Sequence, residues 1–166
     1  MKKLIIVNGP MGVGKSSVCK RLNSRLPKSV WLDGDWCWMM DPFIVDDENK
    51  DMVIDNISHI LRNYLKNSNF QNVILSWVIH KDEILNEILD KIALNNYELK
   101  KITLVCSKNV LKKRVSNDIA SGKRDVESLE RSLAYLKYYE EFVDNKLDTS
   151  EKGKSEIVDE IIKIIE

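Results

Sequence analysis

GPMGVGKS, at residues 9–16, is the stretch that decides the fold of this 166-residue chain. It fits the pattern G-x-x-x-x-G-K-[ST], follows the apolar run LIIV at residues 4–7, and precedes a segment with helical periodicity. A strand, a glycine-rich turn and a helix in this order aim backbone N–H groups and the positive end of a helix dipole at an anion. The sequence therefore predicts a phosphate-binding loop.

Two side chains of this loop have expected tasks. Lys15 would bridge the β- and γ-phosphates of a nucleotide, and the hydroxyl of Ser16 would hold Mg²⁺. The structural alternative, a glycine-rich turn that happens to precede a lysine, would match the pattern by chance in roughly one of a few hundred sequences of this length. The expected nucleotide-binding residues are Gly9, Met11, Gly12, Val13, Gly14, Lys15, Ser16 and Ser17.

The composition is that of one ordinary domain, and we expect residues 1–166 to form it. The 26 basic and 26 acidic residues cancel, so no large basic field is available to bind a nucleic acid. Three cysteines without a CxxC pair argue against a disulfide framework or a zinc site and favour a reducing compartment. The apolar stretch 73–79 is too short to span a membrane, which takes about 20 residues. We expect a soluble, cytoplasmic monomer or homodimer that acts on a small molecule, with no nucleic-acid or membrane partner.

Short β-branched runs alternate with longer segments of helical period along the chain, as is typical of an α/β fold with a parallel sheet between helices. The predicted strands are residues 3–8, 30–33, 73–77, 102–106 and 146–148. The predicted helices are residues 15–26, 49–67, 81–94, 109–121, 126–143 and 155–165.

Two acidic residues, Asp33 and Asp35, close the second predicted strand in the sequence WLDGDW. Residues two apart project to the same side of an extended chain, and the carboxyl ends of parallel strands form the ligand crevice of such sheets. One carboxylate would orient Mg²⁺ through its waters, and the other would accept the proton of an attacking hydroxyl. A surface turn rich in Asp and Gly is the structural alternative.

The loop GPMGVGKSS together with LDGDW at residues 32–36 resembles the shikimate kinase, gluconate kinase and chloramphenicol phosphotransferase group of small P-loop kinases. This resemblance implies the P-loop NTPase fold, a five-stranded parallel sheet in the order 2-3-1-4-5 with a small basic lid. It also implies that Asp33 attends the metal and Asp35 contacts the phosphoryl acceptor. LDGD resembles adenylylsulfate kinase as well, but Asn and then Arg follow there, whereas Trp36 and Trp38 follow here.

Apolar and aromatic residues surround the expected crevice on two sides. Such a wall suits an acceptor with an aromatic or apolar body, such as a nucleoside or an antibiotic, better than a bare polyol. These side chains would otherwise cap the core, and a lone histidine can be an ordinary surface residue. The expected acceptor-binding residues are Asp35, Trp36, Trp38, Met39, Phe43, Trp77 and His80.

The segment after the fourth predicted strand is basic, and the resemblance implies that about residues 114–131 form the lid. It implies that Arg114 lies against the adenine ring and that Arg124, with Lys123 beside it, clamps the phosphates. A closed lid would exclude water and so prevent wasteful hydrolysis. Lys123 and Arg131 fit equally well as solvated helix charges.

The last predicted strand leads into Asp148, Thr149 and Ser150, which the resemblance places beside adenine. The preceding NKLD, residues 145–148, also matches the guanine-reading signature of GTPases. However, no Asp in the chain has Gly three positions later, as a DxxG switch requires, and one predicted helix follows NKLD where a GTPase needs a further strand and helix. The sequence therefore favours ATP over GTP.

These observations predict an ATP- and Mg²⁺-dependent phosphotransferase acting on a hydroxyl of a small molecule, with Lys15, Asp33, Asp35 and Arg124 as catalytic residues. A nucleoside or nucleotide kinase is one alternative. It would need an arginine pair near a phosphorylated acceptor, and between the second and third strands only Arg62 is present. A nucleotide-binding drug-resistance or regulatory protein without kinase activity is another, because the third strand carries no acidic residue of its own.

Overall fold

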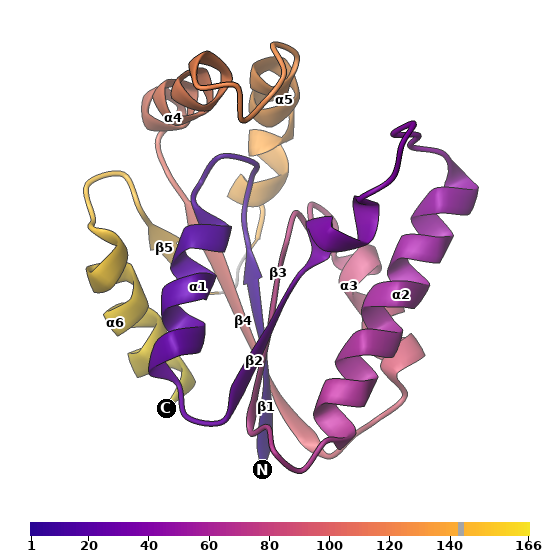
Figure 1. The fold of residues 1–166 in the computed structure, drawn as a ribbon. Coiled ribbons are helices and arrows are strands. Elements are labelled where there is room, and N and C mark those ends of the chain that lie inside the picture. The colour runs from indigo at the N-terminus through magenta and orange to yellow at the C-terminus, as the bar shows by residue number, and fades with distance from the viewer. Residues whose placement is uncertain (143–144) are drawn as a thin grey trace.

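The computed structural model describes residues 1–142 and 145–166 (Figure 1). In this part of the chain a five-stranded sheet has the order β2-β3-β1-β4-β5, and all neighbouring strands are parallel. This confirms the predicted α/β fold and strand order. The strands are β1 (Lys2–Asn8), β2 (Ser29–Asp33), β3 (Asn72–Trp77), β4 (Tyr97–Val105) and β5 (Asn145–Asp148).

The central strand β1 is apolar from Leu4 to Val7, where both of its faces are buried. Leu4 and Ile6 join one hydrophobic cluster, whereas Ile5 and Val7 join a second cluster on the other face of the sheet. This strand ends at Asn8, directly before the glycine-rich loop. The loop is therefore anchored on a strand whose last five residues are all buried.

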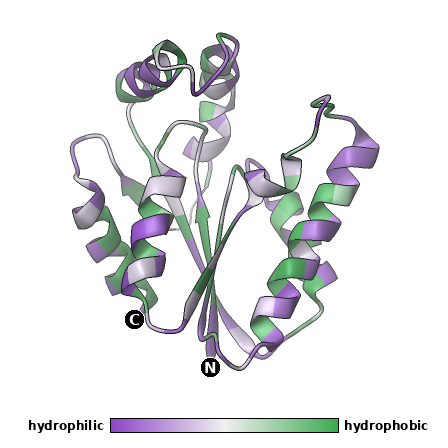
Figure 2. Ribbon diagram, in the orientation of Figure 1, coloured by the Kyte–Doolittle hydropathy of each residue, from purple (hydrophilic) through white to green (hydrophobic). Residues whose placement is uncertain are grey.

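Helices cover both faces of the sheet (Figure 1). Helices α1 (Lys15–Arg25) and α6 (Lys154–Ile165) pack on one face, and α2 (Asp47–Lys66) and α3 (Asp82–Ile92) pack on the other. Figure 2 shows hydrophobic residues concentrated in the strands and in the flanking helices. Truncating one buried aliphatic side chain here, such as Ile161, is expected to cost about 2–5 kcal/mol of stability.

Two further helices stand beyond the carboxyl ends of the strands: α4 (Lys108–Ala120) and α5 (Ser128–Glu140), at the top of Figure 1. Helix α5 is tied to the glycine-rich loop, because the buried Ser132 donates a 2.6 Å hydrogen bond from its hydroxyl to the Met11 carbonyl. None of the described helices is long and apolar enough to cross a membrane.

The structure corrects the sequence-based boundaries at three places. A 3₁₀ helix, η1 (Gly34–Trp38), follows β2 where an extended chain was expected. Strand β4 begins at Tyr97 rather than at 102, since it pairs with β1 from the register Lys2↔Tyr97 onward. Helix α5 ends at Glu140, and the expected end at residue 143 lies outside the described residues.

Candidate nucleotide and acceptor site

The loop between β1 and α1 has the shape of an anion cradle. Gly12 has a φ of 86°, and a Cβ at this position would stand 2.4 Å from Cγ2 of Val115, so only glycine lets α4 pack this close to the loop. Helix α1 starts after Gly14 with no side-chain cap and no acidic residue in its first turn. Its first N–H groups therefore remain open to a bound phosphate, as the motif predicts.

Lys15 lies folded over this loop. Its Nζ donates 2.9 Å hydrogen bonds to the carbonyl oxygens of Gly9 and Pro10. Burial lowers the pKa of Lys15 to about 8, although the nearby carboxylates of Asp35 and Asp33 act in the opposite direction. The two carboxylates thus offset only part of the cost of burying the Lys15 ammonium group. The negative charge of a phosphate would be a favourable further partner for it.

Ser16 and Asp33 meet beside the loop. The Ser16 hydroxyl donates a 2.6 Å hydrogen bond to Oδ2 of Asp33, and the other carboxylate oxygen accepts a 3.1 Å bond from the backbone N–H of Asp35. No group of three or more Asp, Glu, His or Cys capable of holding a metal occurs among the described residues. The Ser16 hydroxyl and the Asp33 carboxylate are oxygen ligands of the kind that proteins usually combine with phosphates and waters to hold Mg²⁺.

Asp35 does not project from an extended strand, as the sequence analysis assumed, but from the first turn of η1. The residue is exposed, yet protein atoms around its carboxyl group displace water and, together with the Asp33 charge, raise the pKa of Asp35. The cations Lys15 and Arg124 and a side-chain hydrogen bond with Trp77 oppose that rise. The four expected catalytic residues thus act on one another electrostatically at one edge of the sheet.

Arg124 belongs to the segment between α4 and α5. Its Nε donates a 3.0 Å hydrogen bond to Oδ2 of Asp118, in an ion pair whose two side chains are both partly buried. Asp118 also accepts the backbone N–H of Lys123 through its carbonyl at 2.8 Å. Sequence reasoning missed this role of Asp118. Arg131, in contrast, forms an exposed ion pair with Asp125, as expected of a solvated helix charge.

Arg114 connects three elements rather than lying free at the surface. Its guanidinium group donates to the Val13 carbonyl at 3.2 Å, to the Thr149 hydroxyl at 2.9 Å and to the Thr149 carbonyl at 2.8 Å. Thr149 is fully buried. Asp148 caps the next turn by accepting the Ser150 N–H at 2.8 Å. Arg114 therefore fixes the segment after β5 against the phosphate loop.

Residues 5–135 match the family model AAA_18, described as an AAA domain. The chain belongs to this AAA domain family. A cytidylate kinase from Buchnera aphidicola subsp. Baizongia pistaciae (strain Bp) is 32% identical to this AAA domain protein over 78 residues, which cover 44% of the chain. The match spans 34% of that relative, about a third of its length.

Solved structures with the same fold as this AAA domain protein include three of high coverage. A tunicamycin resistance protein from Deinococcus radiodurans aligns with a TM-score of 0.68 and 18% identity, over 99% of this chain and 96% of that one. A gluconokinase from Sinorhizobium meliloti 1021 gives 0.69 and 21%, over 97% and 90%. A sugar kinase from Janibacter sp. HTCC2649 gives 0.70 and 12%, over 99% and 95%.

The expected aromatic wall of this AAA domain divides into a packed part and an exposed part. Trp38 and Trp77 pack against the core cluster under α2 and α3, as side chains that cap the core would. Trp36, Met39 and Phe43 are 53%, 85% and 60% exposed. These three large apolar side chains, in η1 and just after it, remain open to water and are available to contact a ligand.

His80 belongs to an aromatic cluster that the sequence analysis missed. Its ring lies 4.8 Å from that of Tyr135 and 5.4 Å from that of Tyr138, both on α5. Partial burial, and then the charge of Lys81, lower the pKa of His80, which favours the neutral form of the ring. The spacing of Tyr135 and Tyr138 three residues apart is the sequence signal that places them on one helix face.

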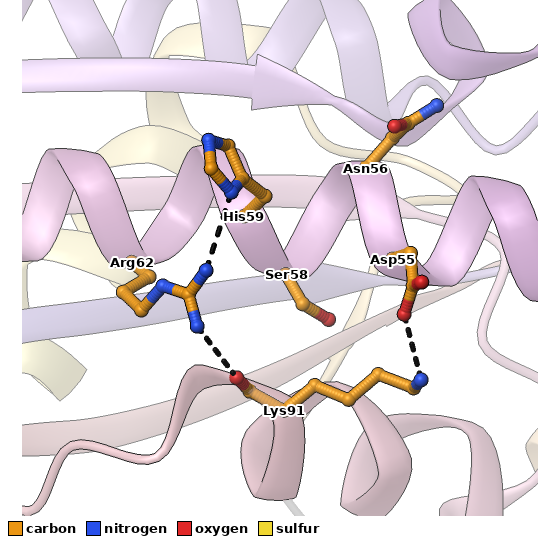
Figure 3. Close-up of a pocket in the computed structure, with 6 residues that line it drawn as sticks. All are labelled: Asp55, Asn56, Ser58, His59, Arg62 and Lys91. Carbon is orange, nitrogen blue, oxygen red and sulfur yellow. Dashed lines mark hydrogen bonds and ion pairs between the residues drawn. The ribbon is translucent and has the colours of Figure 1, made fainter.

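In the part of the chain that the structure describes, cavities also lie away from Asp33 and Asp35. One, of about 390 Å³, is a polar groove between α2 and α3 lined by Asp55, Asn56, Ser58, His59, Arg62 and Lys91 (Figure 3). Its charged side chains have partners within the groove: Lys91 forms a 2.6 Å ion pair with Asp55, and Arg62 donates to the Lys91 backbone carbonyl at 3.5 Å. The second, of about 580 Å³, lies between α5 and the ends of β4 and β5, beside Pro10 of the phosphate loop.

Proposed function

We propose that this protein is an ATP-dependent kinase that transfers a phosphoryl group to a hydroxyl of a small, neutral acceptor with an aromatic or apolar body. The observation that carries the proposal is that the charges of Asp33 and Arg124 act on both Lys15 and Asp35, beside a helix N-terminus without a side-chain cap. A phosphate cradle alone would serve any nucleotide-binding protein. Two carboxylates and a lid arginine beside it are the groups that a transfer reaction needs.

The residues of the loop fit the triphosphate of ATP. The N–H groups at the start of α1 and the ammonium group of Lys15 would hold the β- and γ-phosphates, and Ser16 with Asp33 would hold Mg²⁺. The metal, when bound, neutralises part of the charge on the phosphate oxygens. Arg114 and the Asp148 to Ser150 segment are the expected neighbours of the adenine ring.

The acceptor is proposed to bind between η1 and the end of β3. Its apolar body would contact the exposed side chains of Trp36, Met39 and Phe43, and its hydroxyl would lie against Asp35. An acceptor that already carries a phosphate group would require a cation beside this acceptor site. Arg62, the one arginine between β2 and β3 in the sequence, is held in the groove between α2 and α3 by His59 and the Lys91 carbonyl (Figure 3).

In the proposed reaction the acceptor oxygen forms a new bond to the γ-phosphorus of ATP. The bond from that phosphorus to the β–γ bridging oxygen breaks, its electron pair leaves with ADP, and the hydroxyl proton passes to the Asp35 carboxylate. Lys15 and Arg124 would stabilise the charge that develops on the transferred group. Because the pKa of Asp35 is raised, its carboxylate is a better proton acceptor than an ordinary aspartate.

A nucleoside or nucleotide kinase is the second candidate, and the partial match to a cytidylate kinase favours it. A nucleotide-binding resistance protein without transferase activity is the third. One assay separates all three. The protein is incubated with ATP, Mg²⁺ and separate panels of nucleosides, nucleoside monophosphates, sugars and antibiotics, and phosphorylated products are detected by mass spectrometry.

We expect a neutral nucleoside or antibiotic to be phosphorylated and the Lys15→Met variant to be inactive. Preferred transfer to a nucleoside monophosphate would replace the first candidate with the second. ATP binding without transfer to any acceptor would support the third. The proposal requires no nucleic-acid or membrane partner and is compatible with a monomer or a homodimer.

A further inference from the structure

Asn8, the last residue of β1, makes three buried hydrogen bonds with its side chain. Its Oδ1 accepts the backbone N–H groups of Gly9 and Ile79, each at 2.8 Å, and its Nδ2 donates to the Ile79 carbonyl at 2.7 Å. The side chain is 6% exposed. The first residue of the phosphate loop and the segment after β3 are therefore held by one amide group.

This amide prolongs the pairing of β1 with β3. The backbone register between the two strands ends at the pair Asn8↔Trp77, and Ile79 lies two residues beyond that pair. Only a side chain with one acceptor and one donor at the right length can bond both the N–H and the C=O of Ile79. Without this amide the two buried backbone groups of Ile79 would lose a hydrogen-bond partner out of reach of water, which is unfavourable.

The contacts continue from this segment to the acceptor side. Trp77 precedes Ile79 by two residues, and its ring packs so closely on Gly34 that a Cβ there would lie 2.4 Å from Cγ. Gly34 directly precedes Asp35 in η1, so the position of the Trp77 ring bears on the position of Asp35. A continuous series of packed and hydrogen-bonded groups thus runs from Gly9, through Asn8 and Trp77, to Asp35.

We infer that Asn8 is a positioning residue that couples the phosphate loop to the acceptor side of the site, so that Trp77 and Asp35 respond when a nucleotide binds. Its effect on phosphoryl transfer depends on the proposed function. The coupling itself does not, because it concerns only the nucleotide and this chain's own residues.

The coupling is measured with MgADP as the probe and the indole N–H signal of Trp77 in ¹H–¹⁵N spectra as the readout. A Trp77→Phe variant identifies that signal by its loss. In the wild type, MgADP should shift the Trp77 signal. In Asn8→Ser this shift should fall to roughly a third or less of the wild-type shift. The affinity for MgADP, measured by calorimetry, should stay within about threefold of the wild-type value, because the coupling between two sites and the binding at one of them are separable quantities.

Asn8→Asp provides a second variant in case Asn8→Ser does not fold, as judged by circular dichroism. It keeps the oxygen that accepts from Gly9 and Ile79 and replaces the donor to the Ile79 carbonyl, so the shift should again be reduced. Asn72→Ser is the matched control. It removes one 2.9 Å asparagine hydrogen bond, to the Pro27 carbonyl, at the opposite end of β3 and should leave the Trp77 response intact.

The inference is overturned if the wild-type Trp77 signal does not respond to MgADP, or if folded Asn8 variants keep the full response. Where an acceptor has been found, Asn8→Ser should also lower kcat by about 10- to 100-fold with little change in KM for ATP, since a misplaced acceptor side affects transfer more than binding. Failure to find any acceptor would remove the proposed function. The response of the Trp77 signal to MgADP would still decide whether Asn8 couples the two sides of the site.

Discussion

Ser16, in the first turn of α1, donates a 2.6 Å hydrogen bond to Asp33, the last residue of β2. The hydroxyl expected on Mg²⁺ and the carboxylate expected to orient it are thus already in contact. Asp33→Asn keeps an oxygen that can accept from Ser16 but removes the negative charge. We predict that the Mg²⁺ concentration needed for half-maximal ATP binding rises by about 10- to 100-fold, the effect typical of lost outer-sphere partners. Calorimetric ATP titrations at a series of Mg²⁺ concentrations measure this, and an unchanged requirement would exclude Asp33 from metal binding.

The neighbouring acid is expected to behave differently. Asp35→Asn keeps the shape of the side chain but cannot accept a proton, so transfer should fall by about 10²- to 10⁴-fold while ATP affinity barely changes. The effect would be at the low end if the loose transition state needs little base assistance and Asp35 mainly orients the acceptor. Steady-state kinetics on the identified acceptor, with the exposed Asp41→Asn as control, give the comparison. Wild-type turnover in Asp35→Asn would remove this residue from the mechanism.

Lys15 should make nucleotide binding depend on pH. Its pKa in the folded protein is about 8, below the value of 10.5 in the unfolded chain, so the unfolded state binds more protons between these values. Stability without nucleotide should therefore decrease as pH falls from 10.5 to 8 and then level off with respect to this group. A bound triphosphate restores the ordinary pKa of Lys15 by adding negative charge, so binding near the folded pKa should take up a proton.

Calorimetry of MgATP binding at about pH 8.5, in two buffers with different ionisation enthalpies, measures this uptake through linkage. Lys15→Met should abolish the uptake and weaken binding by about 10- to 100-fold, as expected for the loss of a charged hydrogen-bond donor worth about 1.5–3 kcal/mol. Equal proton uptake in wild type and Lys15→Met would show that another group titrates. Equal ATP affinity in the two proteins, or a clear preference for GTP, would contradict the nucleotide assignment itself.

The sequence predicted those parts of the site that depend on local chain chemistry. The motif at residues 9–16 requires a strand before it and a helix after it, and β1 and α1 are where that rule places them. Asp33 follows from the same logic, because β2 runs parallel to β1 with β3 between them, so the carboxyl ends of both strands lie at the same end of the sheet. The sheet order followed from the family resemblance, and its alternating helices cover the two faces as expected.

Tertiary contacts account for what the sequence did not show. The turn of η1 depends on the hydrogen bond from the backbone N–H of Asp35 to the side chain of Asp33. This bond favours a turn over an extended chain, and the alternation of residues expected of a strand gives no sign of it. The T-shaped contact between the rings of His80 and Tyr135 requires α5 to return over the end of β3, which no local signal specifies. Arg114 was expected at the adenine ring from resemblance, whereas its bonds to Val13 and Thr149 arise only once three elements meet.

The segment Gly122 to Asp125 between α4 and α5 should become protected from hydrogen exchange when a nucleotide binds. Arg124 is now held by Asp118, and a triphosphate would offer its guanidinium group additional charged partners. Hydrogen–deuterium exchange with and without a non-hydrolysable MgATP analogue tests this. Arg124→Met should lose most of the added protection while leaving the exchange of β1 unchanged. Unaltered exchange in this segment at saturating analogue and acceptor would count against a lid.

Gly34 offers a test of the acceptor side that leaves the nucleotide side intact. A methyl group at this position would lie 2.4 Å from Cγ and 2.6 Å from Cδ1 of Trp77, so either η1 or the indole ring must move in Gly34→Ala. Asp35, the next residue, would move with η1. Since a displacement of about 1 Å can cost 10²-fold in rate, we predict a fall in turnover of about that size with unchanged ATP affinity.

Gly34→Ala should also be destabilised by about 1–3 kcal/mol, the usual cost of overpacking, which thermal unfolding measures. Gly153→Ala is the matched control, because Gly153 has a φ of −72° and no atom within 4 Å of an added Cβ. It should retain both stability and turnover. If Gly34→Ala proved as active as Gly153→Ala on the identified acceptor, the contact between Trp77 and η1 would have no part in placing Asp35, and the acceptor would have to bind elsewhere on the edge of the sheet.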